Sequence, residues 1–161
     1  MSRKVHKLKN LRSAKFVDTG PFTTEPKLKG KALEGIKYQA RVHGHAHTLN
    51  GNITEEQWIQ FRDGGSIHHC RPDTIVEQWD RVVVIESKLS LRQLPKGLAQ
   101  LRLYKPLLEH IYSKPVVTVL AFKHWTVGSA GCLPMIDDLS HTLTLPLSTL
   151  RPIHGWNYLG A

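Results

Sequence analysis

Cysteines are scarce in this chain of 161 residues: it has only two, Cys70 and Cys132, and they do not form a C-x-x-C pair. Two cysteines at that distance supply neither a disulfide framework nor a zinc ribbon, so a reducing cytoplasm is the expected compartment. Aromatic residues make up 7% of the chain. Large aromatics in a small domain usually pack in the core, although Trp125 and Trp156 could also stack on bases.

Long hydrophobic runs are also missing. Residues 2–7 are mostly polar and basic, and they contain no apolar stretch of the kind found in signal peptides. No later segment approaches the length of apolar sequence that crosses a bilayer, about 20 residues. We therefore expect a soluble cytoplasmic protein without a membrane partner, and its 40% hydrophobic content is enough for one domain with a core.

Acidic residues are outnumbered. The chain has 22 Lys and Arg against 13 Asp and Glu, which gives a formal charge of +9 and an isoelectric point near 9.8. Such a field attracts nucleic acid through counterion release whatever its base sequence. Basic fields of this size also occur in ribosome-associated proteins, so the charge indicates a polyanionic partner and not a reaction.

Basic residues are concentrated at the N-terminus. Residues 1–29 show no sustained periodicity and predict a basic arm, which either lies on DNA or another chain or is a solvated extension. The remainder, 30–161, predicts a single domain. The arm residues expected to bind nucleic acid are Arg3, Lys4, Lys7, Lys9, Arg12 and Lys15.

The most informative pattern begins at Arg71-Pro72-Asp73. The four β-branched residues of 82–85 predict a buried strand, and 74–79 predicts its antiparallel partner, with a turn near Asp80-Arg81. This hairpin would fold Asp73 back beside Glu86.

Side chains alternate along a strand, so Glu86 and Lys88 should leave the sheet on the same face. Ser87 should point the other way and could offer its backbone carbonyl oxygen to the same site. Two carboxylates, a carbonyl and an amine are then expected to converge on one point.

These residues resemble the PD-(D/E)xK nuclease superfamily, whose signature is a Pro-Asp at one strand and Glu-x-Lys on the next. The following helix carries Gln100 and Tyr104, which resemble the Gln-x-x-x-Tyr motif of the RecB and lambda-exonuclease-like branch. Residues four apart lie on one helix face. Taken alone, Gln100 would be an ordinary solvated position and Tyr104 a half-buried core aromatic.

A first helix is predicted from Gly30 to about His43, because Leu33, Ile36 and Ala40 recur at helical spacing. The resemblance implies that this helix adds an acidic group to the site. Phage-type members have a glutamate after the tyrosine, and this chain has Gln39 there instead. A second metal ion would then be held weakly or not at all, unless Glu34 substitutes; an exposed Glu34 with no role at the site is the alternative.

The expected fold is α/β, with a mixed sheet in a restriction-endonuclease-like αβββαβ core over about 30–122 and an irregular C-terminal extension over 123–161. A three-stranded antiparallel meander is predicted from 56–62, 67–70 and 74–79, with a short helix near Thr54 as the rival for its start. A helix is expected over 95–112, kinked or broken at Pro106, and a buried strand over 116–122.

Histidines cluster twice, which raises a zinc site as an alternative. Their spacing matches no closed four-ligand pattern, and solvated turns or phosphate contacts explain them as well. The residues concerned are His43, His45, His47, His68, His69 and Cys70.

The resemblance implies a divalent-metal-dependent deoxyribonuclease, for example of phage or mobile-element recombination, repair or DNA processing. Asp73 and Glu86, with the carbonyl of Ser87, would bind Mg²⁺ or Mn²⁺. Lys88 would orient the attacking water or stabilise developing charge, and Gln100 and Tyr104 would support it. The alternative is a non-enzymatic nucleic-acid-binding or assembly protein with the same fold, and a homo-oligomer fits either function.

Overall fold

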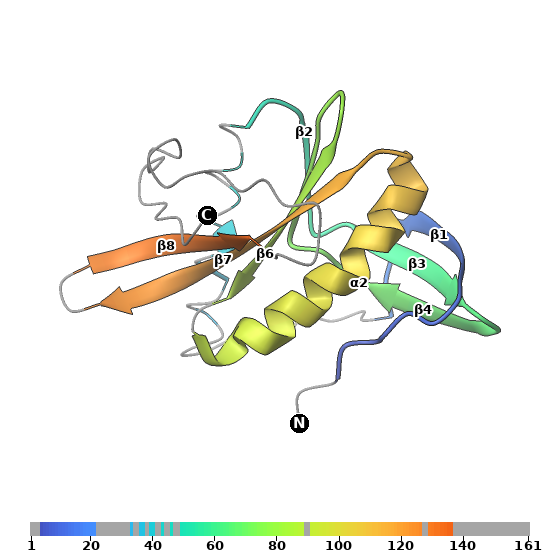
Figure 1. Cartoon of the computed structure of the whole chain (residues 1–161), viewed down its shortest axis with the longest axis horizontal. Coiled ribbons are helices and arrows are strands. Elements are labelled where there is room, and N and C mark those ends of the chain that lie inside the picture. The colour runs from blue at the N-terminus through green and yellow to red at the C-terminus, as the bar shows by residue number, and fades with distance from the viewer. Residues whose placement is uncertain are drawn as a thin grey trace.

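The computed structural model describes residues 4–21, 33, 36–37, 39–40, 43, 46, 49–88, 91–126 and 129–136. It is a mixed α/β fold, as the sequence predicts, and its described strands form two sheets (Figure 1). One sheet contains β1 (Leu11–Val17), β3 (Trp58–Asp63) and β4 (Ser66–Cys70); the other contains β2 (Asn52–Glu55), β5 (Thr74–Glu77), β6 (Val82–Lys88), β7 (Val116–Thr126) and β8 (Ser129–Ile136).

The larger sheet has the order β2-β5-β6-β7-β8. Strands β2, β5 and β6 are antiparallel, β7 runs parallel to β6, and β8 returns antiparallel to β7. Strand β6 lies at its centre, and the predicted apolar run Val82–Ile85 is buried there. A parallel pair needs a crossover connection, and helix α2 (Leu94–Tyr112), preceded by a 3₁₀ turn at Leu91–Gln93, provides it.

Helix α2 lies across the face of the larger sheet and contacts β6, β7 and β1 (Figure 1). The predicted break at Pro106 is wrong, because the helix continues through it to Tyr112. A proline inside a helix costs about 3 kcal/mol. Directly after it, Leu107 and Leu108 are fully buried, and each buried leucine contributes about 1.5–3 kcal/mol. This packing holds the helix together.

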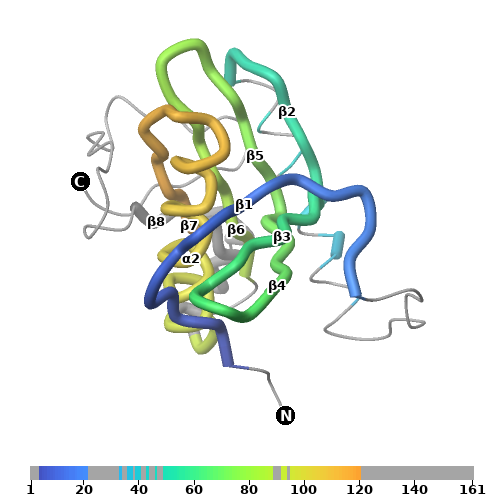
Figure 2. The backbone as a smooth tube through the Cα atoms, turned by 90° about the vertical axis from the view of Figure 1, so that its right-hand side faces the viewer, coloured from blue at the N-terminus to red at the C-terminus, as the bar shows by residue number. Residues whose placement is uncertain are grey.

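The smaller sheet has the order β1-β3-β4, and the β3–β4 hairpin turns at Gly64, whose φ of 59° favours glycine. Figure 2 shows β1 running alongside β3, and the two are antiparallel from Leu11 opposite Asp63 to Val17 opposite Trp58. The N-terminal segment is therefore not an arm in its described part, which corrects that prediction. Strand β1 belongs to the domain.

Apolar residues of the N-terminal segment explain the correction. Leu8, Leu11, Ala14 and Phe16 pack against the hydrophobic core and alternate with exposed polar residues. Burial of this kind outweighs the solvation of a basic segment. The alternation is interrupted by a register shift between Leu11 and Ser13, which hides the strand pattern from the sequence.

The predicted meander is wrong in its first two strands. The segments expected at 56–62 and 67–70 are strands, but they pair with each other and with β1 in the smaller sheet. Strand β2 takes the first place beside β5 instead, with Asn52 opposite Glu77 and Glu55 opposite Thr74. The rival helix near Thr54 is not formed, because Thr54 is part of this strand.

The described residues between 33 and 46 are all helical, in agreement with the first predicted helix. Its inward face is not the predicted one. Leu33 and Ile36 are 40% and 47% exposed, whereas Gln39 and His43 are half-buried and Ala46 is 1% exposed. Among the described residues, none of the helices is both long and apolar enough to span a bilayer.

Candidate active site

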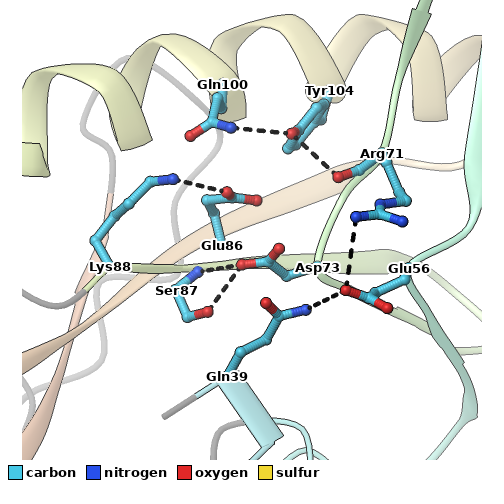
Figure 3. Close-up of polar contacts among 9 residues, drawn as sticks. All are labelled: Gln39, Glu56, Arg71, Asp73, Glu86, Ser87, Lys88, Gln100 and Tyr104. Atoms are coloured by element: carbon cyan, nitrogen blue, oxygen red, sulfur yellow. Dashed lines mark hydrogen bonds and ion pairs between the residues drawn. The ribbon is translucent and has the colours of Figure 1, made fainter. Parts of the chain in front are cut away.

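The β5–β6 hairpin brings together the acidic residues predicted from the sequence (Figure 3). Thr74 pairs with Ile85, so Asp73, one residue earlier, lies beside the end of β6. The Oδ2 of Asp73 accepts hydrogen bonds from the backbone N–H of Ser87 at 2.9 Å and from its Oγ at 2.8 Å. Lys88 Nζ donates to Glu86 Oε1 at 3.1 Å, so these two side chains share a face as expected.

Glu86 is buried and Asp73 is half-buried, and loss of solvent affects the protonation of both. Glu86 is 2% exposed, and burial, followed by the nearby charge of Asp73, raises its pKa to about 8 despite the opposing Lys88. Burial also raises the pKa of Asp73, against the hydrogen bonds from Ser87. Two acids against one lysine leave the site short of positive charge whenever both acids ionise.

One oxygen of this pair has no protein partner. Glu86 Oε2 is buried and makes no hydrogen bond in the described part of the chain. A buried acceptor without a partner costs about 1–3 kcal/mol, and more when it is charged. An unpartnered Glu86 oxygen beside a second carboxylate is expected where a cation or a water molecule completes the site.

Helix α2 closes the site from above with the two predicted residues (Figure 3). Gln100 Nε2 donates to the hydroxyl oxygen of Tyr104 at 3.5 Å, and that hydroxyl donates to the Arg71 carbonyl oxygen at 3.4 Å. Burial, and then the charge of Glu86, raises the pKa of Tyr104 well above its usual value, so it is a neutral donor. Gln100 Oε1 is a second buried atom without a partner in the described structure.

Of the described residues in the first helix, Gln39 lines the cavity. Its Nε2 donates to Glu56 Oε1 at 3.1 Å. Glu34, the other first-helix residue predicted for the site, lies outside the described residues. Ser87 holds Asp73 through its N–H and hydroxyl, while the use of its carbonyl as a metal ligand stays a prediction.

Sequence reasoning missed Glu56. It follows β2 directly, and its backbone N–H donates to the Asp73 carbonyl oxygen at 3.0 Å. Its side chain also faces Arg71, whose Nη2 lies 3.9 Å from Glu56 Oε1 and whose guanidinium stacks 5.1 Å from the centre of the Trp58 ring. No motif marks Glu56, and only the pairing of β2 with β5 brings it to Asp73.

A cavity of about 630 Å³ opens over these groups. Asp73, Glu86 and Glu56 form its acidic part. The cavity is also lined by basic or imidazole-bearing residues from the N-terminal segment, from β4 and the residue after it, and from α2. These residues are Lys4, His6, His68, His69, Arg71 and Lys96.

The other predicted nucleic-acid-binding residues are on the surface. Among them, Lys4, Lys7, Lys9, Arg12 and Lys15 are all exposed, and Arg3 lies outside the described residues. Lys4 alone of this group lines the cavity. The segment thus presents its cations to solvent while its apolar residues pack inward.

The described histidines of the two clusters contact other side chains of the protein. His43 Nε2 lies 3.3 Å from Glu55 Oε2, and His68 stacks on Phe61 with ring centres 5.4 Å apart. His45 and His47 lie outside the described residues. In the part of the chain that the structure describes, no three His, Cys, Asp or Glu side chains are grouped to hold a metal. Burial raises the pKa of the Cys70 thiol to about 12, so it is protonated.

Asp73 and Glu86 are therefore the two carboxyl groups that lie side by side in the site. Hard oxygen ligands of this kind suit Mg²⁺ or Mn²⁺, which keep several waters and bind one or two carboxylates. The unpartnered Glu86 Oε2 fits such an ion. No family model, curated protein or solved structure matches this chain.

Proposed function

We propose that this protein is a divalent-metal-dependent nuclease that hydrolyses DNA phosphodiester bonds. The observation that carries the proposal is the buried, unpartnered Glu86 Oε2 beside Asp73, with Lys88 on the same face of the sheet. A purely structural acid pair would be expected to have a hydrogen-bond partner for every buried carboxylate oxygen. The acid pair lines an open cavity that basic side chains also line, which favours a substrate with phosphates.

The order of the elements supports the resemblance to PD-(D/E)xK nucleases. Strands β2, β5 and β6 form an antiparallel meander, α2 crosses over, and β7 lies parallel to β6. Together with the helical residues before β2, this is the αβββαβ order that the resemblance implies. The β3–β4 hairpin is then an insertion between the first and second strands, and β1 extends it.

The chain's own residues divide the work. Asp73 and Glu86, with the Ser87 carbonyl, would hold Mg²⁺ or Mn²⁺, which supplies an acidified water and neutralises charge on the phosphate. Lys88 Nζ, 3.1 Å from Glu86, carries a positive charge into the cavity, where it can orient a water or a non-bridging oxygen. Ser87 keeps Asp73 oriented by two hydrogen bonds.

Gln100 and Tyr104 line the cavity from α2 and would support the lysine, the water or the phosphate there. Lys4, Arg71 and Lys96 line the same cavity and would bind the phosphates that flank the reacting one. Their contribution is electrostatic and independent of base sequence.

The test is a cleavage assay with plasmid, linear and branched DNA in Mg²⁺, Mn²⁺ or EDTA. We expect cleavage in Mg²⁺ and Mn²⁺, none in EDTA, and none by Glu86→Gln. Asp80→Asn is the matched control, since it removes an exposed carboxylate from the β5–β6 turn. Cleavage that survives EDTA, or that Glu86→Gln retains, would reject the proposal.

A non-enzymatic nucleic-acid-binding protein is the second proposal. The observation that favours it is the neutral Gln39, where the resemblance expects an acid. This function predicts DNA binding that is unchanged by Glu86→Gln and no cleavage of any substrate in either metal. The same assay, with a binding titration added, separates the two.

A further inference from the structure

Glu56 has an unusual backbone conformation. Its φ is 50°, in the left-handed region that residues other than glycine and asparagine rarely adopt. It sits between β2 and β3, where a glycine would relieve the strain. Strained positions of this kind concentrate at functional sites. The backbone conformation therefore favours a functional role for the Glu56 carboxylate.

The Glu56 side chain is held over the cavity. Gln39 Nε2 donates to its Oε1 at 3.1 Å from the first helix, and Arg71 Nη2 lies 3.9 Å from the same oxygen on the other side (Figure 3). The side chain lines the cavity that Asp73 and Glu86 also line. Its charge is one of the causes that raise the pKa of Asp73.

An independent observation is that one carboxylate oxygen in this cavity lacks a hydrogen-bond partner among the described residues. Glu86 Oε2 is buried without a hydrogen bond in the described part of the chain. Lys88, the cation bonded to Glu86, reaches the other oxygen, Oε1. Three carboxylates, one of which has an unpartnered oxygen, therefore line a single cavity; they come from the residue after β2, the residue before β5 and β6 itself.

We propose that Glu56 is the third carboxylate of the cation site and acts through water molecules bound to the ion. The acid that the resemblance places on the first helix is supplied here by the residue after β2, and Gln39 is the positioning residue that orients it. This inference rests on the proposed function, because it assumes a divalent cation at Asp73 and Glu86.

The indirect role follows from the geometry. The described residues contain no group of three His, Cys, Asp or Glu side chains that could hold a metal, so the role we assign to Glu56 is an indirect one. Mg²⁺ and Mn²⁺ retain several waters, whose hydrogens need acceptors. A carboxylate fixed by an amide donor and a guanidinium is a suitable acceptor, and such outer partners typically change metal affinity by about 10- to 100-fold.

The test is Mn²⁺ binding to the full chain without DNA, measured by titration calorimetry. We expect Glu56→Gln to weaken binding by about 10-fold or more. Exchanging the two residues, Gln39→Glu with Glu56→Gln, returns a carboxylate and its amide donor to the same place and should restore most of the affinity. Glu55→Gln is the matched control, because this neighbouring carboxylate faces His43 instead, and it should change affinity less than about twofold.

Each outcome decides one claim. If Glu86→Gln leaves Mn²⁺ binding unchanged, there is no cation site at this acid pair, and the proposed function fails with it. If Glu86→Gln abolishes binding while Glu56→Gln matches the wild type, only the role of Glu56 is overturned. A double exchange that binds no better than Glu56→Gln overturns the positioning role of Gln39.

Thermal unfolding of each variant shows whether it is folded. Should Glu56→Gln fail to fold, Glu56→Gly removes the carboxylate at a φ that glycine accepts. Wild-type Mn²⁺ affinity in folded Glu56→Gly would equally overturn the role of Glu56.

Discussion

Glu86 is the residue at which stability and function oppose each other. Its carboxyl is buried with one oxygen unpaired in the described structure, which favours the neutral form. The ionised form would be needed to bind a cation. A metal-free protein should therefore be destabilised by ionising this group as the pH rises, and the metal-bound protein should not.

The first prediction concerns the pH dependence of stability in EDTA. The pKa of Glu86 rises from 4.5 to about 8 on folding. The native state then binds more protons than the unfolded state between these values, so the free energy of unfolding should fall as pH rises from about 5 to 8 and level off above that range. Denaturant titrations at several pH values measure it.

Glu86→Gln is the control, and it should lose most of this slope. A wild-type protein whose stability rises from pH 5 to 8 would contradict the raised pKa. The half-buried Asp73, whose pKa is also raised, should leave a smaller slope of the same sign.

The second prediction separates chemistry from affinity at Lys88. Lys88→Ala should lower the single-turnover cleavage rate by about 100- to 1,000-fold, because it removes an electrostatic donor from the site. DNA affinity should change little, since the exposed cations remain. Lys105→Ala is the matched control; that lysine pairs with Glu109 on α2. Wild-type cleavage by Lys88→Ala would remove the residue from the mechanism.

At this scale the sequence predicts Asp73, Glu86 and Lys88 because strand alternation and one tight hairpin determine their placement. It also predicts Gln100 and Tyr104, four apart on α2. It does not reveal Glu56, because a residue with positive φ that is joined to Asp73 by β2–β5 pairing leaves no local pattern. Glu56 reaches the site through the pairing of β2 with β5, which are distant in the sequence, whereas local structure places the predicted residues.

Among the elements, the sequence predicts the strands that have strong apolar runs. It does not predict which sheet each strand joins. The central strand β6 and helix α2 occur where the sequence indicates. Strand β2 has only four residues, so it is overlooked, and the β3–β4 hairpin is assigned to the wrong sheet. The inward face of the first helix also differs from the apolar spacing: Gln39 and His43 make polar contacts there, and Leu33 and Ile36 are exposed.

The third prediction concerns the element at the N-terminus. Asp63 on β3 accepts hydrogen bonds from the backbone N–H groups of Lys9 and Asn10 and from His6 Nε2 at 2.6 Å. Asp63→Ala leaves these donors unpaired, and the protein should lose about 1–3 kcal/mol of stability. Amide exchange should accelerate first in β1.

Asp18→Ala serves as the control, since this exposed carboxylate directly follows β1. It should leave both stability and exchange near wild type. The hydrogen bond from His6, with those from Asn10 and Lys9, lowers the pKa of Asp63. The stability that Asp63 contributes is accordingly present above its unfolded pKa, and it is lost as pH falls through the folded value.

The whole molecule carries a charge of +9, and part of it is displayed by the N-terminal segment. Deleting this segment is a poor test of DNA binding, because residues 11–17 form a strand of the domain. Replacing exposed cations with glutamine keeps the strand and removes the charge. The fourth prediction uses this design.

A variant with glutamine at the exposed cations of this segment should bind DNA more weakly. The slope of log affinity against log salt should flatten by about 0.9 for each phosphate of duplex DNA that the variant no longer neutralises. Cleavage at saturating DNA should change little, and an unchanged slope would show that DNA contacts another face. The positions are Lys4, Lys7, Lys9, Arg12 and Lys15.

The pairing of β1 with β3 has a consequence for the order in which the chain folds. Strand β1 leaves the ribosome early, yet its partner positions, from Trp58 to Asp63, are made only after the first helix and β2. Strands so distant along the chain pair slowly, because loop closure reduces chain entropy before the pairing stabilises the sheet. The basic segment is thus unpaired during synthesis, and added polyanions such as heparin should delay its docking during refolding.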